Sequence, residues 1–152
     1  MLKDAIKATG LVSFVLRDEN GNIKAQEDHN LVVSVGLAYI ASRMKDATAT
    51  AMTHMAVGTG TVAAAAADTT LGSEIAGSRV ALTSTTIVTT TVANDSIQYV
   101  ATFNPGVGTG AVTEAGIFNA SAAGTMLART VFPVINKGAL DTLTITWKVT
   151  VA

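Results

Sequence analysis

Two histidines, His29 and His54, are the side chains of this sequence that most readily bind a metal or transfer a proton near neutral pH. They lie far apart in the chain, and neither is followed by a second ligand at helical spacing, as in His-Glu-x-x-His. The chain has no cysteine, which excludes thiolate-bound zinc and disulfides. We expect His29 at the end of a strand and His54 within one, and we predict no metal site and no cofactor.

The sequence offers as little evidence for a catalytic nucleophile or an acid–base pair as it does for a metal site. The members of a Ser-His-Asp triad need not be neighbours in sequence, but no serine lies in a Gly-x-Ser-x-Gly elbow. Glu74 and Glu114 are the acids in apolar surroundings, and a glycosidase would need two such carboxylates held across a cleft. Capping and turn roles account better for both. The sequence therefore predicts no catalytic residue, and we expect that the protein is not an enzyme.

Two glycine-rich runs invite comparison with phosphate-binding loops, namely Gly58-Thr-Gly-Thr and Gly106-Val-Gly-Thr-Gly. Neither completes G-x-G-x-x-G or a P-loop, so both are interpreted as loops between strands. The formal net charge is −1, aromatic residues make up 5% of the chain, and basic residues are scattered. This composition argues against nucleic acid as a partner.

The element that organises the chain is its last predicted strand, over residues 141–151. Leu143, Ile145, Trp147, Val149 and Val151 alternate there with Thr and Lys without a break. Because side chains of a strand point to opposite faces with period 2, this segment has one apolar and one hydroxyl-rich face. The only Trp of the chain lies at its centre and is expected to anchor a core.

Seven more segments have the alternation or β-branched content of strands. In the first hairpin an Asn-Gly turn at 20–21 joins the two strands, and we expect Ile23 and Ala25 to face inward. A second hairpin turns at Asn94-Asp95, and Pro133 is expected to limit pairing just past the seventh segment. These strands are predicted over residues 9–17, 22–27, 53–58, 79–93, 97–103, 111–118 and 125–132.

One short amphipathic helix is predicted near residues 35–46. Ser34 is a plausible N-cap, and a single apolar stripe follows at helical spacing. We expect this stripe to cover one end or one face of the β core. Its residues are Leu37, Ile40, Ala41 and Met44.

About eight closely spaced strands and one helix indicate a mainly β fold, an antiparallel β-sandwich or barrel-like domain. Residues 9–152 are expected to form this single domain, with residues 1–8 as a possible N-terminal arm. No apolar run is long enough to span a membrane. Charged residues are only 14% of the chain, which an assembly covering much of the surface would explain. A monomer with a Thr-rich sheet surface is the alternative.

Three passages resemble a family of small virion proteins from tailed bacteriophages, and together they span nearly the whole chain in order. They begin with Asn30-Leu-Val-Val-Ser-Val-Gly-Leu-Ala-Tyr-Ile-Ala-Ser-Arg, His54-Met-Ala-Val-Gly-Thr-Gly-Thr and Val112-Thr-Glu-Ala-Gly-Ile-Phe-Asn. The resemblance implies no catalytic residue. It implies structural roles for Gly58 and Gly60, in tight backbone geometry, and for Glu114, with a buried hydrogen-bonding partner.

From the resemblance we expect a virion structural protein, made in the host cytoplasm, that decorates or cements the capsid shell. Its partners would be other copies of itself and other virion proteins, above all the major capsid protein. A tail, collar or baseplate connector or a fibre-attachment protein is the alternative. A host-surface carbohydrate-binding module is a more distant one, because one Trp and two Tyr offer few exposed aromatic platforms.

Overall fold

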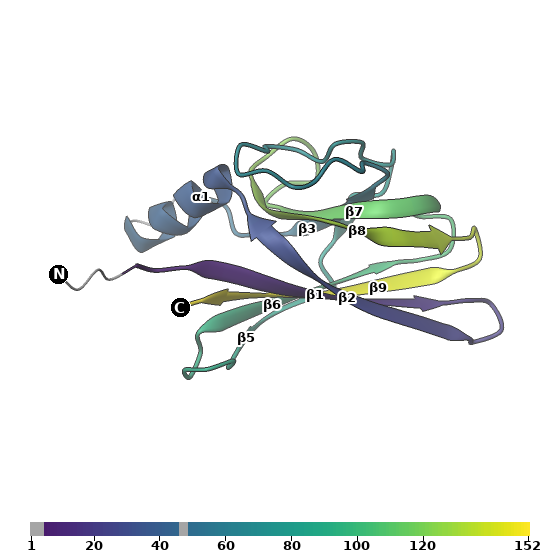
Figure 1. The fold of residues 1–152 in the computed structure, drawn as a ribbon, viewed down its shortest axis with the longest axis horizontal. Coiled ribbons are helices and arrows are strands. Elements are labelled where there is room, and N and C mark those ends of the chain that lie inside the picture. The colour runs from purple at the N-terminus through teal and green to yellow at the C-terminus, as the bar shows by residue number, and fades with distance from the viewer. Residues whose placement is uncertain (1–4, 46–48) are drawn as a thin grey trace.

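A computed structural model describes residues 5–45 and 49–152, and it is mainly β (Figure 1). Within these residues nine strands and one helix follow in the order β1 (Ala8–Arg17), β2 (Ile23–Val32), α1 (Ser34–Lys45), β3 (His54–Gly58), β4 (Val80–Ala81), β5 (Ser84–Val88), β6 (Ser96–Phe103), β7 (Gly110–Phe118), β8 (Met126–Lys137) and β9 (Thr142–Val151). Half of the arm expected over residues 1–8 lies outside the described residues. Of the remainder, residues 5–7 are exposed and Ala8 opens β1.

One antiparallel sheet curls into a half-barrel, which confirms the predicted fold class. The strand order is β4-β3-β7-β8-β2-β1-β9-β6-β5. Figure 1 shows two layers, with β3, β7 and β8 in one and β1, β9, β6 and β5 in the other. β2 belongs to both, because residues 23–30 pair with β1 whereas Leu31 and Val32 pair with β8.

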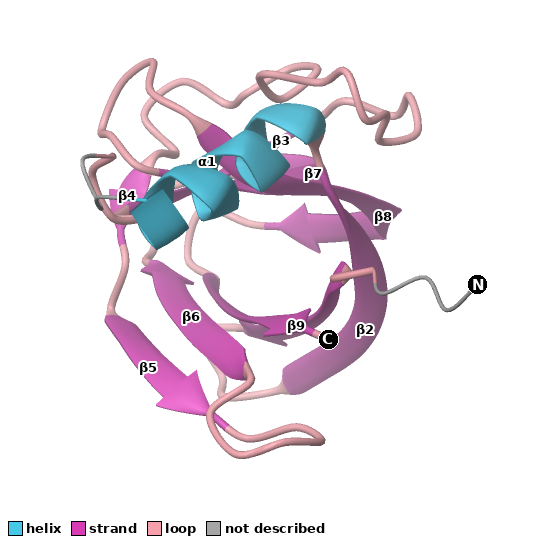
Figure 2. Cartoon of the chain, turned by 90° about the vertical axis from the view of Figure 1, so that its left-hand side faces the viewer, coloured by secondary structure: helices cyan, strands magenta, loops and turns pink. Residues whose placement is uncertain are grey.

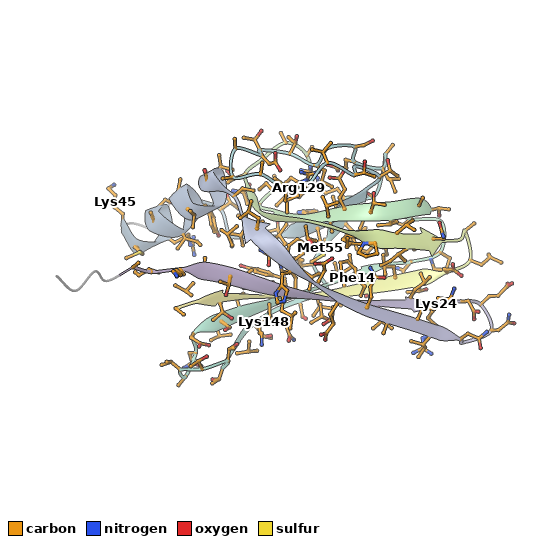
Figure 3. The ribbon with its side chains drawn as sticks, in the orientation of Figure 1. Phe14, Lys24, Lys45, Met55, Arg129 and Lys148 are labelled. Carbon is orange, nitrogen blue, oxygen red and sulfur yellow. The ribbon has the colours of Figure 1, made fainter. Side chains whose placement is uncertain are left out.

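The last strand lies at the centre of its layer, as its alternation predicts. β9 pairs with β1 on one side and with β6 on the other. Leu143, Ile145 and Trp147 are fully buried, and the Trp147 indole N–H donates to Asn30 Oδ1 at 3.0 Å. The rings of Phe14 and Phe132 meet across the layers with centroids 4.2 Å apart. Figure 3 shows Phe14 and Met55 between the two layers, where the core lies.

The orientation predicted for β2 is wrong, since Ile23 is 54% exposed and Ala25 is also exposed. Residues paired across antiparallel strands share a face. The buried Phe14 pairs with Gln26, so the even-numbered residues of β2 face inward and Ile23 and Ala25 face out. The prediction relied on the apolar character of these two side chains. The register of β2 against β1 decides which face they take, and it turns them outward.

The strand predicted over residues 79–93 is two short strands and a turn. β4 pairs with β3 and β5 pairs with β6, so residues 82 and 83 carry the chain from one edge of the sheet to the other. The Leu82 N–H donates to Thr53 O and the Thr83 N–H to Val100 O, which keeps the link bonded to both sides. Beyond Val88, the Asp95 carboxylate accepts from the backbone N–H groups of residues 90–92 and fixes the turn.

Pro133 does not end pairing as expected. β8 continues to Lys137, because its register against β7 shifts between Val112 and Glu114. Val131 pairs with Glu114 and Ile135 with Val112, so three residues of β8 lie opposite Thr113 alone. Such a bulge frees the proline nitrogen, which has no proton, from the ladder.

The helix is confirmed, but its cap and its buried face differ from the prediction. The Leu37 N–H donates to Val33 O, so Val33 rather than Ser34 holds the N-cap position. The buried residue of α1 is Gly36, where a Cβ would overlap the Leu127 carbonyl oxygen. This close approach to β8 turns Gly36, Tyr39 and Ile40 inward. Most of the predicted stripe is exposed in consequence, namely Leu37, Ala41 and Met44.

Candidate functional site

The two histidines do not come together. His29 lies within β2 rather than at a strand end, and His54 opens β3, with β7 and β8 between these strands in the sheet. The His54 Nδ1 is 2.8 Å from the Thr53 hydroxyl. Across residues 5–45 and 49–152 there is no group of three or more His, Asp or Glu side chains that could hold a metal ion.

Glu74 forms an ion pair with Arg79 across a loop. Its two carboxylate oxygens accept from Arg79 Nε at 3.1 Å and Nη2 at 2.6 Å. The Arg79 guanidinium lies 3.7 Å from the centre of the Phe118 ring, and its Nη1 donates to Ala123 O at 2.7 Å. These contacts fasten the loop after β3 to the turn between β7 and β8, which is a structural role of the kind expected for Glu74.

Glu114 is fully buried in β7 and accepts five hydrogen bonds. Oε1 accepts from the backbone N–H groups of Gly60 at 3.0 Å and Ser73 at 2.6 Å. Oε2 accepts from the Gly72 N–H at 2.9 Å and from Arg129 Nη2 and Nε at 2.7 and 2.9 Å. The buried partner expected for Glu114 is therefore Arg129, supported by three backbone amides.

Arg129 extends the network to a second acid. This side chain, 3% exposed, rises from β8 beneath the loops (Figure 3). Its Nη1 donates to Asp68 Oδ2 at 2.7 Å, and its Nη2 also donates to Val62 O at 3.1 Å. Asp68, Glu114 and Arg129 form what we call the anchor cluster. It ties the long loop between β3 and β4 to both strands beneath it.

The electrostatics of the anchor cluster hold its groups ionised. Burial alone would raise the pKa of Glu114, but the backbone donors and Arg129 outweigh it and lower this pKa below its usual value. Burial likewise opposes the charge of Arg129, yet Glu114 and Asp68 raise its pKa. Every oxygen of Glu114 is occupied by protein donors, so the cluster is built to fix a loop rather than to transfer a proton.

The glycines that surround this carboxylate are needed for space. A Cβ at Gly58 or at Gly60 would lie 2.5 Å from Glu114 Oε1. Neither residue has a positive φ, so close approach rather than backbone conformation explains them. The tight geometry expected for both is present. No local pattern in the sequence indicates Arg129, because its ion pair is set by the register of β7 against β8.

Lys137 is a second buried cation that sequence reasoning missed. Its Nζ donates to the carbonyl oxygens of Asn104 at 3.1 Å and Asp141 at 2.7 Å, and the side chain is 2% exposed. Burial lowers its pKa. The contacts join the loop after β6 to the β8–β9 turn, which again is a structural role.

Apolar rather than charged side chains gather where α1 lies across the open end of the half-barrel (Figure 2). A groove of about 460 Å³ separates the helix from β5, β6 and β9. Its walls include Tyr39 and Ile40 from α1, Ile97 and Tyr99 from β6, and Val149 from β9. Burial raises the pKa of Tyr99 to about 12, consistent with apolar surroundings.

Exposed apolar side chains lie on α1, β5 and β9 and on the segments next to β1 and β5, and two of them, Met44 and Val151, line this groove. Single exposed apolar residues are ordinary on a protein surface, but a group of them marks a contact region. We call this region the helical end and define it by Ile6 (72% exposed), Leu37 (49%), Met44 (75%), Ile87 (64%), Val92 (66%) and Val151 (40%).

Comparisons with family models, curated proteins and solved structures find no match to this chain. Among the described residues, no helix has the length and apolar content required to cross a membrane. The candidate site therefore stands on its geometry: an ionised cluster that fixes the loops on one side, and an exposed apolar region at the helical end.

Proposed function

We propose that this protein is a structural component of a tailed-bacteriophage virion, and that it decorates or cements the capsid shell. The observation that carries the proposal is the helical end, which combines an apolar groove with six exposed apolar side chains, two of which, Met44 and Val151, line that groove. Such a surface is typical of a site that another protein covers. The resemblance of three passages to small virion proteins supplies the kind of assembly, and the major capsid protein is the partner that we propose.

The role is adhesive rather than catalytic, and it requires no cofactor. A cement protein works by adding buried area across the joints between shell subunits, and apolar surface contributes about 25 cal/mol per Å² buried. A rigid β body suits this task because little conformational entropy is lost when it docks. The anchor cluster supports such rigidity by fixing the longest loop to the sheet.

The carbohydrate-binding alternative loses support from the position of the aromatic residues. Sugar-binding surfaces use exposed aromatic rings, but Trp147 is fully buried and Tyr99 is 7% exposed. Tyr39 packs against the core.

Copy number in purified virions, measured by quantitative mass spectrometry against the major capsid protein, tests the proposal. A stoichiometry comparable with the capsid protein is the expected result. Particles lacking this protein should still assemble but lose resistance to heat and osmotic shock. A handful of copies per particle would instead favour the tail, collar or baseplate connector, and absence from particles would refute a virion role.

A further inference from the structure

The outer edge of β5 is an open sheet edge. β5 stands last in the strand order and pairs only with β6, over the five residues Ser84–Val88. Within the part of the chain that the structure describes, no strand lies on its other side. Backbone N–H and C=O groups on an open edge need water or another strand as partner.

This edge carries none of the usual protections against pairing. Natural sheets blunt their edges with lysine, proline or bulges. Between Arg79 and Asp95 the sequence has no charged residue and no proline, and β5 pairs with β6 in one continuous register. The opposite edge, β4, is only two residues long. β5 is therefore the edge to which a further strand can be added.

We propose that the occupant is β5 of a second copy of this chain, paired antiparallel about a two-fold axis. Such pairing is self-complementary, because each strand offers the other the same surface. An axis at Thr86 places this residue opposite itself, and paired threonines are favourable across strands. No like charges meet in this register, since residues 80–94 carry none.

The groove of the helical end is a second reason to expect the pairing centred on Thr86. Thr85 pairs with the buried Tyr99 and Ile87 pairs with Ile97, so both face the groove side of the sheet. In the dimer, Ile87 of each copy lies opposite Thr85 of the other, and Thr85 lines the groove. The exposed Ile87 of each copy thus reaches the groove of the other, and pairing covers two apolar side chains at once.

A charge introduced at the two-fold axis tests this dimer with the purified full chain. Thr86 is exposed, so Thr86→Lys and Thr86→Glu should leave the monomer folded, which circular dichroism and urea unfolding check. Sedimentation equilibrium should show a dimer for the original sequence. Each variant alone should dimerise about tenfold more weakly or worse, because two like charges then face each other. An equimolar mixture of the two variants should restore the dimer.

Thr146→Lys is the matched control, because it adds the same charge to the same face of the sheet two strands away from the edge. Thr146 pairs with Val100, which pairs with Ser84. This variant should dimerise like the original. In the original sequence, the backbone amides of Ser84–Val88 should also exchange hydrogen more slowly at high protein concentration, where the dimer forms. A chain that stays monomeric, a dimer that ignores the Thr86 charges, or a mixture that fails to restore pairing would each overturn the proposal. None of these outcomes bears on copy number in virions, so the virion role is tested separately.

Discussion

The anchor cluster and the helical end place their polar and apolar groups in opposite ways. In the anchor cluster two buried charged side chains of β7 and β8, Glu114 and Arg129, bond to each other, to backbone amides of the loop above them and to Asp68 of that loop. At the helical end, apolar side chains from α1, β5 and β9 remain in contact with solvent. The two regions therefore differ in role: the anchor cluster holds the fold together, whereas the helical end leaves apolar surface in solvent, where we propose that a partner docks. Substitutions should therefore have opposite consequences in the two regions.

The largest effect is expected from Arg129→Met. It leaves the Glu114 carboxylate buried without its cation, and such a loss costs about 3 to 5 kcal/mol of unfolding free energy. Urea unfolding measures it. Arg79→Met is the control, because Glu74 is 30% exposed and the expected cost is about 1 to 2 kcal/mol. The double variant Glu114→Gln/Arg129→Met should be more stable than Arg129→Met alone. Equal losses for the two arginines would remove the distinction between anchor and ordinary surface pair.

Gly36→Ala should destabilise the protein by about 1 to 3 kcal/mol, because the added methyl overlaps the Leu127 carbonyl. In an exposed helix the same change stabilises by roughly 1 kcal/mol, so the sign of the effect is diagnostic. Ala41→Gly on the exposed side of α1 should cost only the ordinary helix propensity. Thermal unfolding compares the three proteins, and a Gly36→Ala variant more stable than the original would show that α1 does not depend on this contact.

The anchor cluster should also make stability depend on acidity. The pKa of Glu114 is lower in the folded protein than its unfolded value of about 4.5, so the unfolded chain binds more protons between the two values. Its stabilisation is complete above the unfolded pKa and is lost as pH falls through the folded one. Unfolding free energies at stepwise lower pH should fall more steeply for the original than for Glu114→Gln/Arg129→Met. Parallel curves would contradict an ionised anchor, since Asp18 and Asp95 titrate in both proteins.

The smallest effect on the monomer is expected at the helical end. Leu37→Ser and Met44→Ser should change the unfolding free energy by no more than about 0.5 kcal/mol, because Leu37 is already 49% and Met44 75% exposed to water. The same variants should weaken attachment to particles, measured by co-sedimentation with shells that lack the protein. Val149 of β9 lines the same groove but is only 4% exposed, so Val149→Ser should instead destabilise the fold. Full attachment by both surface variants would move the contact region elsewhere.

The sequence predicted what depends on neighbouring residues and missed what depends on register. The alternation of β9 predicts its buried face correctly because every second residue agrees, up to Val149. Ile23 was placed on the wrong face because its own polarity says nothing of its partner Arg17 in β1. Likewise, the period of α1 predicts a helix, but Gly36 decides which side approaches β8.

The candidate site divides in the same way. Apolar neighbours of Glu114 indicate a buried acid, yet its partner Arg129 lies on the neighbouring strand, opposite Gly116, and only the register of β7 against β8 brings the two together. Nothing local to Lys137 indicates that two carbonyl groups will surround its ammonium. Leu37, Met44 and Val151 of the helical end were predicted on apolar faces toward the core, because a strand or helix pattern shows that a face is apolar but not what covers it.

The pairing of β1 with β9 has a mechanical consequence. Ala8 lies opposite Val151, and the neighbouring backbone groups of Lys7 and Ala152 bond to each other. A force that pulls Lys7 away from Ala152 would act perpendicular to the two strands, so it would load one pair of hydrogen bonds at a time. The hydrogen bonds between β1 and β9 would then break one after another from this end, at low force. A pull along β1 against β9 would strain all the hydrogen bonds of the ladder together, so the protein should resist tension far better in that direction.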